Sequence, residues 1–180
     1  MSGEGPVPED RELVLAAAAG DARAFEALYR RHRDYVLRLA GRFGLGEQDA
    51  LDVLQETFLY VCRKLPDLEL RASFTTFLYP AVKHLCLKRK GFLARFLPWG
   101  GLFGGAEGVP EAAVDPAPGG DLSRLLALLP AGQREVVLLR FVDGMDLAEI
   151  AAALGVPAGT VKSRLHNALK FLRERLEAEK

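Results

Sequence analysis

The feature that most restricts the fold of this 180-residue chain is the segment 91–120, in which twelve of thirty positions are glycine or proline. Such a composition is typical of a connector and cannot supply a packed core. On both sides of it, apolar residues recur at helical spacing, and no useful stretch shows the alternation of a strand. The sequence therefore predicts an all-α protein: two small helical domains joined by a flexible linker. We expect a tail with a short helix at 1–20, the first domain at 21–91, the linker at 92–120 and the second domain at 121–180.

Capping residues indicate where several helices begin and end. Asp21 and Ser73 each precede an apolar pattern of helical period, the position that N-cap residues occupy. Asp146 is followed three residues later by Glu149, which together form the start of a capping box. Gly155 is then expected to end the helix that Asp146 begins.

Pro80 conflicts with the helix that is predicted to begin after Ser73. A proline in a helix interior removes one backbone hydrogen bond, clashes with the preceding turn and costs about 3 kcal/mol or more. We therefore expect a bend or a broken turn between Thr76 and Pro80.

The segment 47–65 predicts a helix with two contrasting faces. Its apolar face carries Leu51, Leu54, Phe58, Val61, Cys62 and Leu65. We expect both cysteines of the chain, Cys62 and Cys86, to be buried. The opposite face carries Asp52, Gln55, Glu56, Leu59 and Arg63. A lone exposed leucine is common on a solvated helix face, but beside carboxylates it also fits the centre of a protein interface.

The charge of the chain is unevenly distributed although 24 basic and 24 acidic residues cancel. Residues 21–91 carry a net charge of +4 and residues 122–180 carry +2, whereas residues 92–121 between them carry −3. Residues 160–175 hold five basic side chains and one acidic side chain. Because local charge determines a binding face, the zero total does not exclude a nucleic-acid partner.

Several classes of protein are disfavoured by motifs that the sequence lacks. It contains no phosphate-binding loop, dinucleotide fingerprint, HExxH or GxSxG motif, so we expect no enzymatic activity. Its two cysteines and three histidines have no metal-ligand spacing, and we expect no metal or other cofactor. No apolar run reaches the roughly 18 residues of a membrane span and no signal peptide opens the chain, so we expect a cytoplasmic protein without membrane insertion.

The segment from Asp146 onward predicts a helix-turn-helix, a motif whose second helix enters the major groove of DNA. On a helical wheel, the core side of the last helix carries Val161, Leu165, Ala168 and Leu172. The opposite side carries Lys162, Ser163, His166 and Asn167. Lysine reads guanine and asparagine pairs with adenine in the major groove, while Lys170 and Arg173 suit phosphates. The alternative is an ordinary helical hairpin with a solvated basic face, but the turn spacing and capping favour DNA binding.

Taken together, these residues resemble a bacterial sigma factor of the extracytoplasmic-function type, whose members contain only regions 2 and 4. The resemblance covers about residues 21–91 and 122–176. Four motifs carry it in the family's order: FEALYRR (25–31), DVLQETF (52–58), LP followed by QREV (129–136) and GTVKSRL (159–165).

The resemblance implies a promoter-specificity subunit that binds core RNA polymerase and both double- and single-stranded promoter DNA. The clamp of the largest polymerase subunit would bind Asp52, Gln55, Glu56 and Leu59, and region 4 would contact the flap. The minus-ten element would be recognised and melted by Arg71, Ser73, Phe74, Phe77, Lys83, His84, Lys88 and Arg89. The minus-thirty-five element would be recognised by Thr160, Lys162, Ser163, Arg164, His166, Asn167 and Lys170. An anti-sigma protein would be a further partner.

Two other functions remain open at this point. A stand-alone helix-turn-helix regulator would bind duplex DNA as a dimer, but it would not need the acidic face at 52–59. An interaction protein that only sequesters a regulator would not need the basic face at 160–175. Both features are used by a sigma factor.

Overall fold

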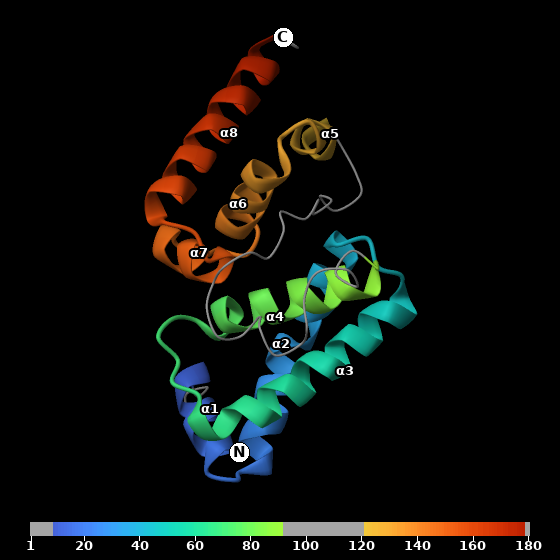
Figure 1. Cartoon of the computed structure of the whole chain (residues 1–180), viewed down its shortest axis with the longest axis vertical. Coiled ribbons are helices and arrows are strands. Elements are labelled where there is room, and N and C mark those ends of the chain that lie inside the picture. Colours follow the sequence, from blue (N-terminus) through green and yellow to red (C-terminus); the bar gives the residue numbers. More distant parts are fainter. Residues whose placement is uncertain (1–8, 92–120, 179–180) are drawn as a thin grey trace, which may run out of the picture.

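The computed structural model describes residues 9–91 and 121–178, and every regular element in these ranges is a helix (Figure 1). In chain order the elements are α1 (Asp10–Ala18), α2 (Ala22–Arg42), α3 (Glu47–Lys64), the 3-10 turn η1 (Leu65–Asp67), α4 (Phe74–Arg89), α5 (Asp121–Ala127), α6 (Ala131–Phe141), α7 (Leu147–Leu154) and α8 (Ala158–Ala178). The predicted all-α class is confirmed. The segment 92–120, predicted as the linker, lies outside the described residues.

The predicted caps are present. The Asp21 carboxylate accepts hydrogen bonds from two backbone N–H groups in the first turn of α2, and the Ser73 hydroxyl accepts one in the first turn of α4. Asp146 and Glu149 form both halves of a capping box at the start of α7. Gly155 ends α7 with φ of 65°, a left-handed conformation that glycine adopts without the steric penalty of a Cβ.

Of the expected bend or broken turn near Pro80, the broken turn is wrong, because α4 runs as one α-helix from Phe74 to Arg89 with Pro80 inside it, while the bend stays a prediction. The residues next to the proline explain why the helix survives. Tyr79, Ala81 and Val82 are all buried, and burying such side chains offsets the backbone hydrogen bond that proline cannot make.

The first block, residues 9–91, is built by neighbouring contacts of α1 with α2, α2 with α3, and α3 with α4. The buried face of α3 differs from the predicted one: Leu51 is 43% exposed and Cys62 is exposed, while Ala50, Val53 and Thr57 are buried. The face is rotated because α3 packs against both α2 and α4, rather than against one neighbour. The prediction that Cys62 is buried is wrong, and the same prediction for Cys86 is confirmed.

The second block, residues 121–178, consists of α5 to α8, and α8 packs on α5, α6 and α7. Its long helix α8 buries Val161, Ala168 and Leu172, as the helical wheel predicts. The two blocks are in contact, since α7 packs on α4 (Figure 1). Their buried apolar side chains form one continuous cluster. This contact between the blocks was not predicted from the sequence.

Candidate functional site

The structure places the four predicted polymerase-binding residues on one accessible face of α3. Gln55 is exposed, Asp52 and Glu56 are partly exposed, and the Leu59 side chain is 53% exposed. Residues at i, i+3 and i+4 lie on the same side of a helix, which explains why the four side chains share this face. We call Asp52, Gln55, Glu56 and Leu59 the acidic face.

Arg89, at the end of α4, binds the acidic face and does not stand apart as a DNA contact. Its Nη1 lies 2.8 Å from Asp52 and 3.2 Å from Asp49, and its Nη2 lies 3.0 Å from Glu56. The hydrogen bond with Glu56, followed by those with Asp52, raises the pKa of the guanidinium above its ordinary value. One predicted DNA-binding residue therefore neutralises part of the surface predicted for polymerase.

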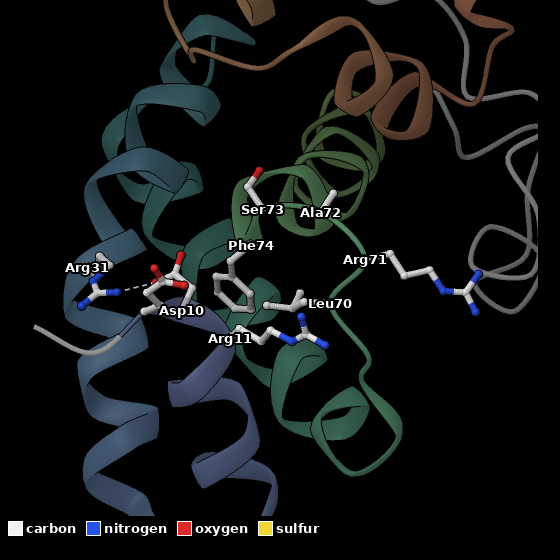
Figure 2. A pocket seen from close by; sticks show the side chains of 9 residues that line it. Asp10, Arg11, Arg31, Leu70, Arg71, Ala72, Ser73 and Phe74 are labelled. Carbon is white, nitrogen blue, oxygen red and sulfur yellow. Dashed lines mark hydrogen bonds and ion pairs between the residues drawn. The ribbon is translucent and has the colours of Figure 1, made fainter.

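A cavity of about 500 Å³ lies beside the loop that precedes α4 (Figure 2). Its walls are formed by residues of α1 with its N-cap, of α2, of the loop and of the start of α4, namely Glu9, Asp10, Arg11, Arg31, Leu70, Arg71, Ala72, Ser73 and Phe74. The Phe74 ring lies between Asp10 and Leu70, whereas the Arg71 side chain points away from the cavity (Figure 2). We call this space the loop cavity.

At the wall of the loop cavity, the Asp10 carboxylate pairs with two basic side chains of α2. Asp10 lies 2.6 Å from Nη1 of Arg31 and 2.8 Å from Nε2 of His32. Sequence reasoning missed Asp10, Arg11 and Arg31 as cavity residues. The position of Arg31 outside the apolar stripe of its helix was the available signal, but the contribution of α1 depends on how it packs against α2.

The aromatic residues of α4 differ in accessibility. Phe74 is completely buried, with its ring 4.9 Å from the His32 ring and 5.8 Å from the Phe77 ring, measured between centroids. Phe77 is partly exposed and stacks on Tyr60 at 5.8 Å. Burial raises the pKa of Tyr60 to about 12, so its hydroxyl stays protonated at neutral pH. Of the two phenylalanines, Phe77 is the more accessible.

The basic residues predicted for minus-ten DNA are not equally accessible in this conformation. Lys88 is exposed, but Lys83 and His84 are buried, at 4% and 2% exposure. The Lys83 ammonium lies 2.7 Å from the carboxylate of Glu135, which belongs to α6 of the second block. Binding of DNA by Lys83 therefore requires the two blocks to separate.

The buried imidazole of His84 predicts a pH-dependent stability. Burial and then the positive charge of Lys88 lower the pKa of His84, and the carboxylate of Glu56 opposes them only in part. The folded protein thus favours neutral His84, and the stabilisation is complete above the ordinary pKa of 6.5 and is lost as pH falls through the lowered value.

We expect the free energy of unfolding to fall on acidification below pH 6.5, with a contribution from His84 of at most about 1.4 kcal/mol per pH unit. The measurement is urea unfolding across this range for the parent chain and for His84→Gln, which removes the titrating group. His166→Gln is the matched control because His166 is exposed. Parallel pH curves for the parent and His84→Gln would contradict the expectation.

The helix-turn-helix presents the predicted minus-thirty-five residues to solvent on α8. Lys162, Ser163, His166, Asn167 and Lys170 are exposed, and Thr160 and Arg164 are partly buried. The Ser163 hydroxyl donates to the Thr160 carbonyl at 3.0 Å, which orients it in the first turn of α8. Unlike Lys83 and His84 of α4, this face is accessible with the blocks in contact.

Two further properties of the described residues bear on function. Within residues 9–91 and 121–178, no group of three His, Cys, Asp or Glu side chains is placed to hold a metal ion. None of the helices in these same ranges is both long and apolar enough to span a bilayer.

Comparison with known families identifies both blocks. The family model of Sigma-70 region 2 matches residues 28–94, and that of Sigma-70, region 4 matches residues 120–172. Together the two matches cover most of the residues that the structure describes.

Individual relatives agree with these matches. The ECF RNA polymerase sigma factor SigE of Mycolicibacterium smegmatis is 32% identical, over 95% of this chain and 70% of the relative. The RNA polymerase sigma factor CnrH of Cupriavidus metallidurans is 30% identical, over 96% of this chain and 97% of the relative.

Solved structures resemble this fold as well. The structure of CnrH in complex with the cytosolic domain of CnrY matches with a TM-score of 0.65 and 28% identity, over 95% of this chain and 99% of that chain. The sigma factor RpoE of Bartonella quintana, solved with the anti-sigma factor NepR, matches in fold with a TM-score of 0.61 and 22% identity, over 88% and 100% of the two chains.

Proposed function

Because this chain belongs to the extracytoplasmic-function group of sigma-70 family RNA polymerase sigma factors, which act in transcription initiation and are not enzymes, we propose that its two blocks divide promoter recognition between them. In this proposal residues 21–91 bind the polymerase clamp and recognise and melt the minus-ten element. Residues 121–180 bind the minus-thirty-five element and the polymerase flap. The remaining segments are the tail with a short helix at 1–20 and the linker at 92–120.

The observation that carries the proposal is the acidic face of α3, where Leu59 is exposed beside Asp52 and Glu56. An apolar side chain ringed by charges fits the pattern of interfaces, in which a dry centre is surrounded by a polar rim. The clamp of the largest polymerase subunit is the partner that the family implies. For the flap, the exposed apolar side chains of Phe141 and Val142 at the end of α6 offer a contact surface.

The loop cavity supports capture of an unpaired minus-ten base. Arg11 lies at its wall, Arg31 lies there in an ion pair with Asp10, and the buried Phe74 ring holds the wall in place. Removing a base from the duplex costs a few kcal/mol, which a pocket and backbone contacts offset. Four of the residues predicted for minus-ten DNA are accessible in this conformation: Arg71, Ser73, Phe77 and Lys88. The other three with basic side chains, Lys83, His84 and Arg89, would contact DNA only after their present contacts are released.

The exposed face of α8 suits the minus-thirty-five duplex. Lysine and asparagine side chains read base edges in the major groove, and Lys162 and Asn167 are both accessible for this. Lys170 and Arg164 supply charge for phosphates, which position the helix without specifying sequence.

The proposal extends to where the chain acts and what regulates it. Core polymerase and promoter DNA lie in the bacterial cytoplasm, so we place the chain there. The related RpoE is solved with an anti-sigma factor, and we infer that a protein of this kind is a further partner of this chain.

Run-off transcription with purified core polymerase, with and without the chain, tests the proposed function. Promoter-dependent transcripts that need the chain are the expected result. Binding of duplex DNA without transcripts would instead indicate a stand-alone helix-turn-helix regulator, and neither activity would indicate a protein that only sequesters a regulator.

We expect Leu59→Ala to weaken binding to core polymerase at least about tenfold, because truncating the apolar centre of an interface has the largest effect on affinity. Leu15→Ala is the matched control, since Leu15 on α1 is also exposed and lies outside the proposed surfaces. Fluorescence anisotropy with labelled chain measures both affinities. Equal affinities for the two variants would remove the acidic face from the proposed interface.

A further inference from the structure

The Asp10 carboxylate is an unusual group to find in the wall of a cavity that is proposed to take DNA. Asp10 is the first residue of α1, and its side chain is 24% exposed, so it is within reach of a bound molecule. A fixed negative charge repels the phosphates of a DNA strand at short range. A carboxylate in this place therefore needs a partner other than a phosphate.

Each oxygen of the Asp10 carboxylate is held by one side chain of α2. Oδ1 lies 2.6 Å from Nη1 of Arg31, and Oδ2 lies 2.8 Å from Nε2 of His32. A carboxylate offers about four lone-pair sites, so each oxygen can accept another hydrogen bond in addition. The two contacts thus fix the orientation of the carboxylate and leave it able to accept from a molecule in the loop cavity (Figure 2).

The rest of the loop cavity suits a flat and partly apolar molecule. Its volume of about 500 Å³ lies within the range of small-molecule sites. Leu70 is partly buried and lies on the far side of the Phe74 ring from Asp10 (Figure 2). The cavity therefore has apolar surface at one wall and a hydrogen-bond acceptor at another. Enzymes that read an extruded base use this combination, contacting its face and its hydrogen-bonding edge.

Two arginines lie where the backbone of a captured nucleotide would run. Arg11 on α1 and Arg71 in the loop are both exposed and both line the loop cavity. They also line a second cavity of about 580 Å³ that shares Leu70 as a wall, so the two spaces are neighbours. The Arg71 side chain points away from the loop cavity (Figure 2). This places its guanidinium for a phosphate outside the cavity while the base lies inside.

The four DNA bases differ in what they offer to a carboxylate. Adenine, cytosine and guanine each carry an exocyclic amino group that donates hydrogen bonds, whereas thymine carries none. A hydrogen bond to an ionised acceptor is stronger than one between neutral groups. Thymine brings only its imino N–H, which lies between two carbonyl oxygens that the negative charge repels. A carboxylate at the edge of a captured base therefore distinguishes thymine from the other three.

We propose that Asp10 is a specificity-determining residue of the loop cavity: its carboxylate selects an unpaired base that has an amino group and disfavours thymine. Arg31 and His32 are positioning residues that hold the carboxylate toward the base. This inference rests on the proposed function of the loop cavity, the capture of an unpaired minus-ten base. If Asp10 served only to attach α1 to α2, its loss would affect all four bases alike.

Binding of short single-stranded DNA to the full chain tests the inference. Four fluorescent strands of about nine nucleotides, a length within known single-strand site sizes, carry thymine everywhere except at the centre. The central base is adenine, cytosine, guanine or thymine. By fluorescence anisotropy, we expect the parent chain to bind each of the first three strands about tenfold more tightly than the all-thymine strand.

Asp10→Asn is expected to remove this preference, because the amide keeps the side-chain shape but can donate to the carbonyl oxygens of thymine. Asp10→Glu keeps the charge, and we expect it to retain part of the preference. Asp34→Asn is the matched control: the Asp34 side chain on α2 is 71% exposed and lies outside the cavity wall. This control removes the same charge and should keep the preference of the parent.

The ratio between strands separates base selection from a general loss of binding. A variant that only loosens α1 lowers all four affinities by the same factor and leaves their ratio unchanged. A parent chain that binds the four strands equally, or an Asp10→Asn chain that keeps the parent's ratio, would overturn the inference. The proposed function is judged separately by run-off transcription. Transcripts without base preference would therefore leave the sigma function standing and remove only the role of Asp10.

Discussion

Phe74→Ala is expected to lower the free energy of unfolding by about 3–5 kcal/mol, and the midpoint of thermal unfolding by about 10 °C. Phe74 is completely buried and touches the rings of His32 and Phe77, so alanine would leave a cavity between α2 and α4. Calorimetry and urea unfolding measure the change. The residue thus supports the loop cavity mainly by holding its wall in place.

Phe141→Ala is the matched control for this substitution. Phe141 is 61% exposed at the end of α6, and we expect a change within about 0.5 kcal/mol. A Phe74→Ala chain that kept its unfolding midpoint and lost only promoter opening would show that Phe74 acts through a direct contact with DNA.

Arg134→Ala is expected to destabilise the second block by about 2–4 kcal/mol. The Arg134 guanidinium donates to the Ala127 carbonyl at 2.8 Å and to the Leu129 carbonyl at 3.0 Å, and so holds the end of α5 against α6. Hydrogen bonds from a charged group contribute about 1.5–3 kcal/mol each, and their loss leaves buried carbonyls without this donor. Because α5 also packs on α8, we expect binding to minus-thirty-five duplex to weaken in parallel with stability.

Two variants bracket the effect of Arg134. Arg134→Lys retains the charge but not the planar fork, so we expect an intermediate loss. Arg124→Ala removes an arginine of α5 whose side chain is 87% exposed, and we expect almost no change in unfolding. Equal stability of Arg134→Ala and Arg124→Ala would rule out a structural role for Arg134.

The helices and their caps could be predicted because the signals for them are local. Asp21, Ser73 and Asp146 each satisfy backbone N–H groups within three residues, and Gly155 supplies the positive φ of its turn. Such features depend on neighbouring residues alone, which is why the predicted and observed boundaries agree closely.

Features that depend on tertiary contacts were predicted less well. A break at Pro80 follows from backbone chemistry, but packing on both sides of α4 outweighs it. Leu51 and Cys62 fit an apolar stripe drawn for one partner helix, and α3 has two. The contact between the blocks was inaccessible to sequence patterns, since it joins residues such as Lys83 and Glu135 that are far apart in the chain.

In the candidate site, too, features set by local sequence were predicted and features set by tertiary contacts were not. Exposure of the acidic face and of the α8 face follows from helical periodicity, and the structure has both. The family resemblance also assigned Lys83 and Arg89 to minus-ten DNA, but each is engaged by carboxylates from another helix. Their partners are set by how α4 meets α3 and α6.

The three ion pairs of Arg89 connect the surface proposed for minus-ten DNA with the surface proposed for polymerase. Its guanidinium fixes Asp49, Asp52 and Glu56, so replacing it to alter promoter preference also rearranges the surface meant for the clamp. In the proposed function, promoter choice and affinity for polymerase are therefore coupled at this position. On the same proposal, we expect a hybrid that takes α4 from a homologue to need the matching α3 carboxylates as well, because otherwise its changed promoter preference would come with weaker binding to polymerase.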